Sequence, residues 1–444
     1  MEKPIVAKFG GSSLANSEQF KKVKKIIEEN PNRRFVVPSA PGKSNPEDTK
    51  VTDLLYLLWD LYTHNQDYSK VLENIANKYE DIAKGVGLDF DITEHIELIM
   101  KEIDAGASVE YVVSRGEYLN GILLSQYLGY EFVDPADFIV FNTRGQLDEE
   151  LTYSLTSKRL AKLENAVIPG FYGSLPNGKT MTFSRGGSDL TGAIIARGAD
   201  AQIYENWTDV SGFLIADPRI IKNPQGISRI TYKELRELSY MGASILHDEA
   251  IFPVVSKGIP IHIKNTNKPE DEGTEIVADG TPSKDQPRIT GIAGRKDFTV
   301  IYIEKVKLNQ DKSFHRKLMS ILESNDIYLE HMPSSIDSIS LLINDDDSKP
   351  LINDIVSEIK AVCKPDSIGY TKNISLIAVV GHGMRYASGT AATLFSALAD
   401  SDINVRVIVQ GSSELSIIVG VEDRDYEKAI SAIYDHFITR TKKE

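Results

Sequence analysis

Residues 184–189 read Ser-Arg-Gly-Gly-Ser-Asp, and they stand between an expected strand over 180–184 and an expected helix over 189–198. A helix N-terminus presents unpaired N–H groups and the positive end of the helix dipole, and both suit an anion. Helix capping alone would explain Ser188 and Asp189, but not the arginine and two glycines in front of them. The stretch therefore predicts an anion-binding turn of an α/β fold.

The segments around this turn continue the alternation of strands and helices. Strands are expected over 4–9, 34–38, 166–169, 180–184, 201–205 and 259–264. Helices are expected from Ser17 onward and over 52–64, 69–84, 92–104, 117–128, 189–198 and 243–257. This alternation predicts one domain over residues 1–264, with a mainly parallel or mixed sheet covered by helices on both faces.

Two other regions carry residues suited to phosphate. Residues 8–13, Lys-Phe-Gly-Gly-Ser-Ser, follow the first strand, where two glycines let backbone N–H groups approach a phosphate and Lys8 can reach the transferred group. Residues 207–209 and 217–219 resemble a nucleotide-side loop, in which Arg219 can pair with phosphates. Each segment alone is more often a plain turn. Together, without a Walker A or protein-kinase pattern, they favour a different class of phosphoryl-transfer enzyme.

Composition narrows the function classes. The chain has 444 residues, 41% of them hydrophobic, and a formal net charge of -14, which argues against nucleic acid or an anionic membrane as partner. Its single cysteine, Cys363, excludes an internal disulfide and suits a reducing compartment. Neither an apolar run long enough to span a bilayer nor a signal peptide is recognisable, so we expect a cytoplasmic protein.

The second half of the chain begins with a change in composition. Residues 265–290 are rich in polar residues, glycine and proline, so we expect a linker, with an edge hairpin as the alternative. An internal repeat with a spacing of 76 residues follows, in which Leu318, Ser320, Leu322, Asp326, Ile327 and Ser340 recur as Leu394, Ser396, Leu398, Asp402, Ile403 and Ser416. Two small units of this kind, at 291–372 and 373–444, must pack together to bury a core.

With these motifs in view, the whole chain resembles the aspartokinases of the amino-acid kinase superfamily. The resemblance rests on Ser39-Ala40, Val51-Thr52-Asp53-Leu54, Arg115-Gly116-Glu117 and Thr208-Asp209, together with residues 8–13 and 185–189. It implies a three-layer αβα sandwich followed by two ferredoxin-like βαββαβ ACT domains, which are amino-acid-sensing modules.

The resemblance also implies a role for each matching position. Lys8 and Asp189 would be catalytic; Ser39, Thr52, Glu117, Arg185 and Ser188 would bind L-aspartate; and Lys8, Gly10, Gly11, Thr208, Asp209 and Arg219 would bind ATP. Mg²⁺ would arrive with ATP and not in a protein metal site. The effector, lysine or threonine or both, would bind at Ser313, Phe314, Leu329, Glu330, Ser334 and Ser335. ACT domains would join a homodimer or a tetramer. A solvated charge on a strand explains Glu330 equally well.

The chemistry of the acceptor agrees with this interpretation. An aspartate side chain with a pKa near 4 is ionised in all but about one molecule in a thousand at pH 7, so no general base is needed. The main obstacle is repulsion between a carboxylate and a triphosphate, which cations and N–H groups held in place can overcome.

Three positions depart from the family pattern, and two alternatives stay open. Leu214 stands where many members have an aromatic residue beside the adenosine, and Ser244 stands where some have a lysine near the nucleotide, so the way in which adenine is held is open. Asp248 replaces a common proline. Another amino-acid kinase would share the glycine turns but not the Arg115-Gly116-Glu117 stretch with tandem ACT units. A non-enzymatic amino-acid sensor would not need Lys8, Arg185 and Asp189 together.

Overall fold

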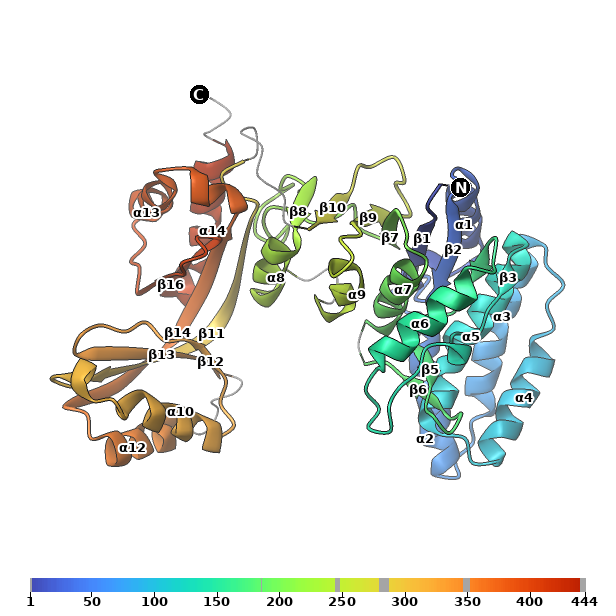
Figure 1. Ribbon diagram of the computed structural model, residues 1–444, viewed down its shortest axis with the longest axis horizontal. Helices are drawn as coiled ribbons and strands as arrows, with labels where there is room; N and C mark the ends of the chain where they lie inside the picture. The colour runs from blue at the N-terminus through green and yellow to red at the C-terminus, as the bar shows by residue number, and fades with distance from the viewer. Residues whose placement is uncertain (1, 185, 244–247, 279–286, 346–351, 440–444) are drawn as a thin grey trace. The chain divides into compact units, whose positions relative to one another are not determined.

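The computed structural model describes residues 2–184, 186–243, 248–278, 287–345 and 352–439. The chain divides into two compact units, and each is described by itself (Figure 1). Unit 1 comprises Met1–Phe213, Gly226–Tyr232 and Ile245–Gly280, and unit 2 comprises Leu214–Gln225, Lys233–Ser244 and Thr281–Glu444.

Unit 1 is built on an eight-stranded sheet in the order β3-β4-β2-β1-β7-β9-β10-β8. All neighbouring strands pair parallel except β9 and β10. The strands are β1 (Ile5–Phe9), β2 (Arg33–Pro38), β3 (Glu131–Phe132), β4 (Ala166–Val167), β7 (Ile203–Thr208), β8 (Arg229–Thr231), β9 (Ile261–Asn265) and β10 (Thr274–Val277). A separate hairpin joins β5 (Tyr172–Ser174) and β6 (Thr180–Thr182). The mixed sheet confirms the predicted α/β class.

Helices cover this sheet because their apolar residues recur on one side of each helix. Buried residues from five helices form one core with Ala7, Phe9 and Trp207 of the sheet. These helices are α1 (Ser17–Glu28), α2 (Val51–Thr63), α3 (Ser69–Val86), α4 (Ile92–Asp104) and α5 (Val109–Leu128). The helix α7 (Gly187–Gly198) packs on β1, β2 and β7, and it also contacts α6 (Glu149–Leu160) and α9 (Phe252–Val255).

Unit 2 contains a six-stranded sheet in the order β12-β13-β11-β14-β16-β15, with antiparallel neighbours. Its strands are β11 (Gly291–Glu304), β12 (Leu329–His331), β13 (Ser338–Asn344), β14 (Ser367–Val380), β15 (Val407–Gln410) and β16 (Ser416–Glu422). Its helices include α8 (Tyr232–Tyr240), α10 (Phe314–Ser324), α12 (Ile352–Cys363), α13 (Thr390–Asp400) and α14 (Tyr426–Tyr434). The first module has the expected βαββαβ order, from the second half of β11 to the first half of β14, and the second repeats it as far as α14.

The two modules share their longest strands. The second half of β11 pairs with β13 and the first half of β14, whereas Gly291–Arg295 pairs with Leu376–Val380 of β14. The last strand of the second module thus comes from the start of β11 and not from residues after 373. The predicted boundary between 372 and 373 falls inside β14, because one continuous strand serves both modules.

The 76-residue repeat corresponds to equivalent structural positions. Leu318 and Leu394 are both fully buried in the first helix of their modules. Asp326 and Asp402, which follow these helices, have φ values of 54° and 52°. This left-handed conformation ends a helix, and aspartate tolerates it better than most residues.

Several local predictions need correction. The predicted linker contains β10, which pairs with β8 and β9, so its first half belongs to the sheet of unit 1. The helix α1 begins at Ser17 as predicted and is capped by the side chain of Asn16, whereas α5 begins at Val109, eight residues before the predicted start at 117. Within the predicted helix at 243–257, the described part is a short 3-10 turn followed by α9, which begins at Phe252-Pro253. No helix in the described ranges is long and apolar enough to cross a membrane.

Candidate active site

Lys8 and Asp189 form an ion pair at the centre of unit 1. The Nζ atom of Lys8 lies 2.6 Å from Oδ1 of Asp189, and the two side chains are only 10% and 15% exposed. Lys8 comes from the penultimate position of β1, and Asp189 comes from the first turn of α7. The two predicted catalytic residues are therefore in direct contact, which neither motif alone required.

The neighbouring strand β7 holds Asp189 in place. Asn206 is the partner of Lys8 in the parallel β1–β7 pairing, and its Nδ2 donates to the same Oδ1 of Asp189 at 3.0 Å. Two residues earlier, the hydroxyl of Tyr204 donates to the backbone carbonyl of Asp189 at 3.0 Å. Both β7 side chains are buried. The sequence analysis did not identify Asn206, because an asparagine inside a strand matches no motif.

The glycine turn after β1 packs closely against the segment after β2. A Cβ atom on Gly11 would lie 2.9 Å from the carbonyl oxygen of Ala40, and the N–H of Gly42 donates to the carbonyl of Gly11 at 2.8 Å. The N–H of Gly10 donates to the carbonyl of Trp207 at 3.0 Å. The structure does not agree with the prediction that the Gly10 amide holds a phosphate, because this N–H is already hydrogen-bonded to Trp207 of β7.

The predicted anion-binding turn has the expected form where it is described. Gly186 has a φ of 75° at the N-cap of α7, a conformation that favours glycine. A Cβ on Gly187 would lie 2.8 Å from side-chain atoms of Phe171 and Phe183. Ser188 follows in the first turn of α7, is 9% exposed and contacts the backbone of Gly170. The predicted substrate residue Arg185 lies outside the described residues.

Glu117 and Asn120 of α5 converge on Ser39 and Ala40. The Nδ2 of Asn120 donates to the carbonyl of Ser39 at 2.6 Å. Complete burial raises the pKa of Glu117 to about 8, although N–H groups of Ala40 and Glu117 and the charge of Lys8 act in the opposite direction. The sequence analysis named Ser39 and Glu117 but not Asn120. The remaining predicted substrate residue, Thr52, is the second residue of α2 and is partly buried.

Arg115, next to Glu117 in sequence, points into an aromatic cluster. Its guanidinium carbon lies 4.4, 4.3 and 5.3 Å from the ring centroids of Tyr111, Tyr118 and Tyr172. Its Nη2 atom donates to the hydroxyl of Ser114 at 2.9 Å. Within the Arg115-Gly116-Glu117 stretch, the arginine therefore stabilises the packing of α5, and the glutamate is the candidate for substrate binding.

The predicted nucleotide residues belong to two units. Thr208 ends β7 in unit 1, and its hydroxyl donates to Asp209 at 3.2 Å. Arg219 belongs to unit 2, where its Nε and Nη2 atoms donate to Asp217 at 3.0 and 2.6 Å. The side chain of Arg219 is 88% exposed, so Asp217 orients a guanidinium that stays accessible to solvent. Leu214 is also exposed in unit 2, while Ser244 lies outside the described residues.

The predicted effector residues group around α10 and β12 of the first ACT module. Ser313 precedes α10, but its N–H and hydroxyl both donate to Asp311, and Lys305 lies 2.8 Å from the same carboxylate. Lys305 first, and then Ser313, hold the pKa of Asp311 well below its usual range. The N–H and hydroxyl of Ser313 thus already bind a carboxylate of the chain itself.

The other predicted effector residues lie at the start of α10, on β12 and in the turn before β13. Phe314 is fully buried at the start of α10. Glu330, on β12 next to Leu329, accepts a hydrogen bond from the hydroxyl of Tyr240 and lies 3.5 Å from Nη1 of Arg295. Ser334 and Ser335 lie in the turn that leads to β13. Glu330 is therefore a paired group and not a solvated charge.

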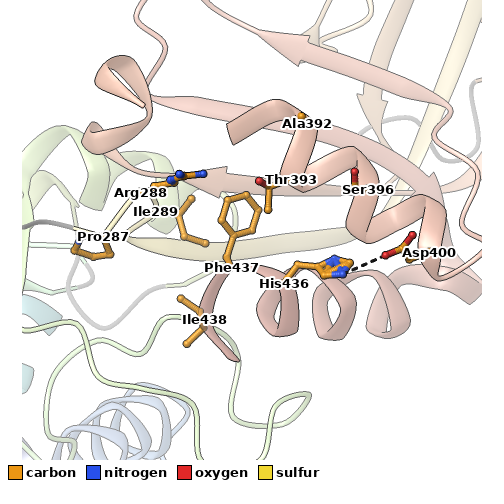
Figure 2. A pocket seen from close by; sticks show the side chains of 10 residues that line it. All are labelled: Pro287, Arg288, Ile289, Ala392, Thr393, Ser396, Asp400, His436, Phe437 and Ile438. Atoms are coloured by element: carbon orange, nitrogen blue, oxygen red, sulfur yellow. Dashed lines mark ion pairs between the residues drawn. The ribbon is translucent and has the colours of Figure 1, made fainter. Parts of the chain in front are cut away.

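A separate cavity lies in the second ACT module. Its volume is about 470 Å³, and it is bounded by residues 287–289, by α13 and by residues 436–438 (Figure 2). None of the six predicted effector residues lines it.

Across the described ranges, no cluster of three or more His, Cys, Asp or Glu side chains could hold a metal ion.

Comparisons with known proteins agree with this architecture. Residues 3–265 match the model of the amino acid kinase family, and residues 377–437 match an ACT domain model. Aspartokinase 3 of Bacillus subtilis (strain 168) is 38% identical over 451 residues, covering 97% of this chain and 98% of that protein. Lysine-sensitive aspartokinase 3 of Escherichia coli (strain K12) is 25% identical over 462 residues, covering 98% and 99%.

A solved structure extends the likeness to three dimensions. The crystal structure of aspartate kinase from Clostridium acetobutylicum, described as an allosteric enzyme, is 51% identical and covers 98% of this chain and 100% of that one, with a TM-score of 0.90. The matched family model and the similarity to aspartokinases over nearly the full length agree with the observed fold. The chain therefore belongs to the aspartokinases of the amino acid kinase family, with a C-terminal ACT region.

Proposed function

We propose that this enzyme transfers the γ-phosphoryl group of ATP to the side-chain carboxylate of L-aspartate, giving 4-phospho-L-aspartate. The observation that carries the proposal is the contact of Lys8 with Asp189, beside the N-terminus of α7. A lysine fixed in this way is a cation held where negative charge develops during transfer. Membership of the family supports aspartate as the acceptor.

The protein's contribution to the reaction is to position reactants and to stabilise charge. The acceptor carboxylate is already ionised at neutral pH, so no side chain needs to remove a proton. Lys8 would lie against the transferred phosphoryl group, and Asp189, held by Asn206, would keep the lysine in place. Mg²⁺ bound to ATP would supply the remaining positive charge on the phosphates.

The remaining candidate residues would bind L-aspartate or ATP beside the Lys8–Asp189 pair. Glu117 would accept from the α-ammonium of L-aspartate, and Arg185 would pair with its α-carboxylate, with Ser39, Thr52 and Ser188 as further contacts. Gly11, Thr208, Asp209 and Arg219 would face ATP. Support for the aspartate pocket comes from the convergence of Glu117 with the Ser39–Ala40 segment and from the buried position of Ser188.

The ACT modules would bind lysine, threonine or both as feedback inhibitors. The E. coli relative is named lysine-sensitive, which supports lysine. Glu330 would accept the ammonium of the effector in place of the Tyr240 hydroxyl. A homodimer or tetramer joined through the ACT domains and a cytoplasmic location stay predictions.

Trapping the product with hydroxylamine tests the reaction. An acyl phosphate gives a hydroxamate, so the purified chain with Mg²⁺ and ATP should give coloured product from L-aspartate and none from L-glutamate. Adding millimolar L-lysine and L-threonine, singly and together, tests the feedback. No product from L-aspartate with folded protein would reject the reaction, and activity unmoved by either amino acid would reject the effectors.

A further inference from the structure

Two side chains of α5 reach the same short segment after β2. Glu117 and Asn120 are three residues apart, so they lie on one side of the helix. The Nδ2 of Asn120 donates to the carbonyl of Ser39 at 2.6 Å, and the N–H of Ala40 donates to the carboxyl group of Glu117. The two side chains therefore end at adjacent backbone positions.

The close approach of the helix depends on Gly116. A Cβ atom there would lie 2.9 Å from the Cβ of Ala40 and 3.2 Å from Leu55. Because no side chain intervenes, the side of α5 that carries Glu117 and Asn120 packs directly against residues 39 and 40. Both residues are buried, at 5% and 0% exposure.

Each of these two side chains keeps one buried oxygen atom without a hydrogen-bond partner. Among the described residues, Oε2 of Glu117 and Oδ1 of Asn120 are buried and unpaired. The orientation of the Asn120 amide follows from its other contact, because the carbonyl of Ser39 can only accept and must face the NH₂ group. Its oxygen is thus an acceptor directed elsewhere. A buried acceptor without a donor costs free energy, which a bound donor would recover.

We propose that Asn120 is a further substrate-binding residue, whose Oδ1 accepts a hydrogen bond from the α-ammonium of L-aspartate beside Oε2 of Glu117. This inference rests on the proposed function, in which Glu117 binds that ammonium. An ammonium has three N–H groups, so it can donate to both atoms at once. A neutral amide adds a directional contact without adding a second negative charge close to a substrate that carries two carboxylates.

This arrangement predicts selectivity for an amino acid over a plain dicarboxylate. The Oε2 atom of Glu117 and the Oδ1 atom of Asn120 are both buried. An ammonium bound to them would therefore not compete with water. A site built in this way discriminates strongly against an analogue that lacks the donor, because the analogue leaves both acceptors unpaired. Succinate, which is L-aspartate without its amino group, is that analogue.

The test compares L-aspartate with succinate on the full-length protein and three variants. Asn120→Leu removes both polar atoms at similar volume, whereas Asn120→Asp keeps an acceptor oxygen. Ser125→Ala is the matched control, since Ser125 is a buried polar residue of the same helix whose hydroxyl bonds the helix backbone. Dissociation constants come from ligand-observed NMR titration, which needs no phosphoryl transfer, and thermal unfolding checks each variant.

Asn120→Leu should weaken L-aspartate binding about ten- to a hundredfold, as expected for a lost hydrogen bond to a charged group. Succinate binding should change less than about threefold, and Asn120→Asp and Ser125→Ala should keep the preference for L-aspartate.

Equal weakening of L-aspartate and succinate binding in Asn120→Leu would overturn the proposal, because Asn120 would then act only by holding Ser39. Unchanged L-aspartate binding in Asn120→Leu would overturn it as well. If Asn120→Leu does not fold, loss of the preference in Asn120→Asp contradicts it. Intact, selective binding without hydroxamate would reject the reaction and leave this inference standing.

Discussion

The Nζ atom of Lys8 and the Oδ1 atom of Asp189 lie 2.6 Å apart, although the two residues are far apart in the sequence. The same carboxylate oxygen accepts a hydrogen bond from Asn206. A strand, its parallel neighbour and a helix N-terminus thus each contribute one side chain to a single contact. Such a lysine is held in place before the phosphoryl group arrives, which is the condition for electrostatic stabilisation without reorganisation.

Replacing Asn206 should slow the reaction more than it weakens binding. Asn206→Leu removes the donor that fixes Asp189, so we expect kcat to fall about ten- to a hundredfold while KM for both substrates stays within about threefold. Asn177→Ala, at an exposed turn where the side chain accepts from the N–H of Lys179, is the control and should leave kcat unchanged. A large rise in KM with normal kcat would show that Asn206 acts on binding instead.

The buried carboxyl group of Glu117 should make the protein less stable as the pH rises. Its pKa is raised from 4.5 to about 8 in the folded state. Between these values the folded state binds more protons than the unfolded state, so stability is full below 4.5 and is lost as the pH rises toward 8. Each unit of the shift is worth about 1.4 kcal/mol.

Glu117→Gln carries a permanently neutral side chain of the same shape and should not lose this stability. We expect the thermal unfolding midpoints of the two proteins to be close at pH 5, with the variant higher at pH 8. A constant difference between them across this range would mean that Glu117 ionises at an ordinary pH.

The two glycines after β1 should respond differently to alanine. At Gly11 a Cβ atom would lie 2.9 Å from a backbone oxygen, which cannot move aside easily, whereas at Gly10 its nearest neighbour would lie 3.6 Å away. Gly11→Ala should therefore cost about 1–3 kcal/mol of stability, and Gly10→Ala much less. Urea or thermal unfolding of the two variants measures this. Equal losses would mean that the turn adapts at both positions.

The contact between Tyr240 and Glu330 should oppose the effector. If the effector's ammonium binds Glu330, it must displace the tyrosine hydroxyl. Tyr240→Phe removes that competitor, so half-maximal inhibition by lysine should require a several-fold lower concentration. Glu330→Gln should abolish the inhibition and leave uninhibited activity unchanged. Inhibition that is identical in all three proteins would place the effector elsewhere.

Parts of the fold could be predicted because burial leaves a pattern in the sequence. Leu318 and Leu394 recur at 76 residues because each fills the core of its own module. β10 was foreseen only through the alternative of an edge hairpin, since Thr274–Val277 is only four residues long and lies in a polar segment. Likewise, no local signal shows that β11 donates its first half to the second module, because that pairing joins residues far apart in sequence.

The candidate site was predicted where residues belong to motifs and missed where they do not. Lys8 and Asp189 stand beside glycines that a tight turn requires, and the structure brings them together. Asn206 lies inside a strand and Asn120 inside a helix, where no motif marks them. Their importance is seen only from their hydrogen bonds to Asp189 and Ser39, which are distant in sequence. The Gly10 amide was assigned to phosphate, but its bond to Trp207 depends on the β1–β7 pairing, which sequence alone does not specify.

The most direct test of the Lys8–Asp189 pair is a double-mutant cycle on kcat for hydroxamate formation from L-aspartate. Lys8→Met and Asp189→Asn should each lower kcat by about a thousandfold, and the double variant should be no slower than the slower single variant, because the two groups act as one unit. Single variants that keep kcat within about threefold of the unmodified protein, or losses that simply multiply, would contradict the account.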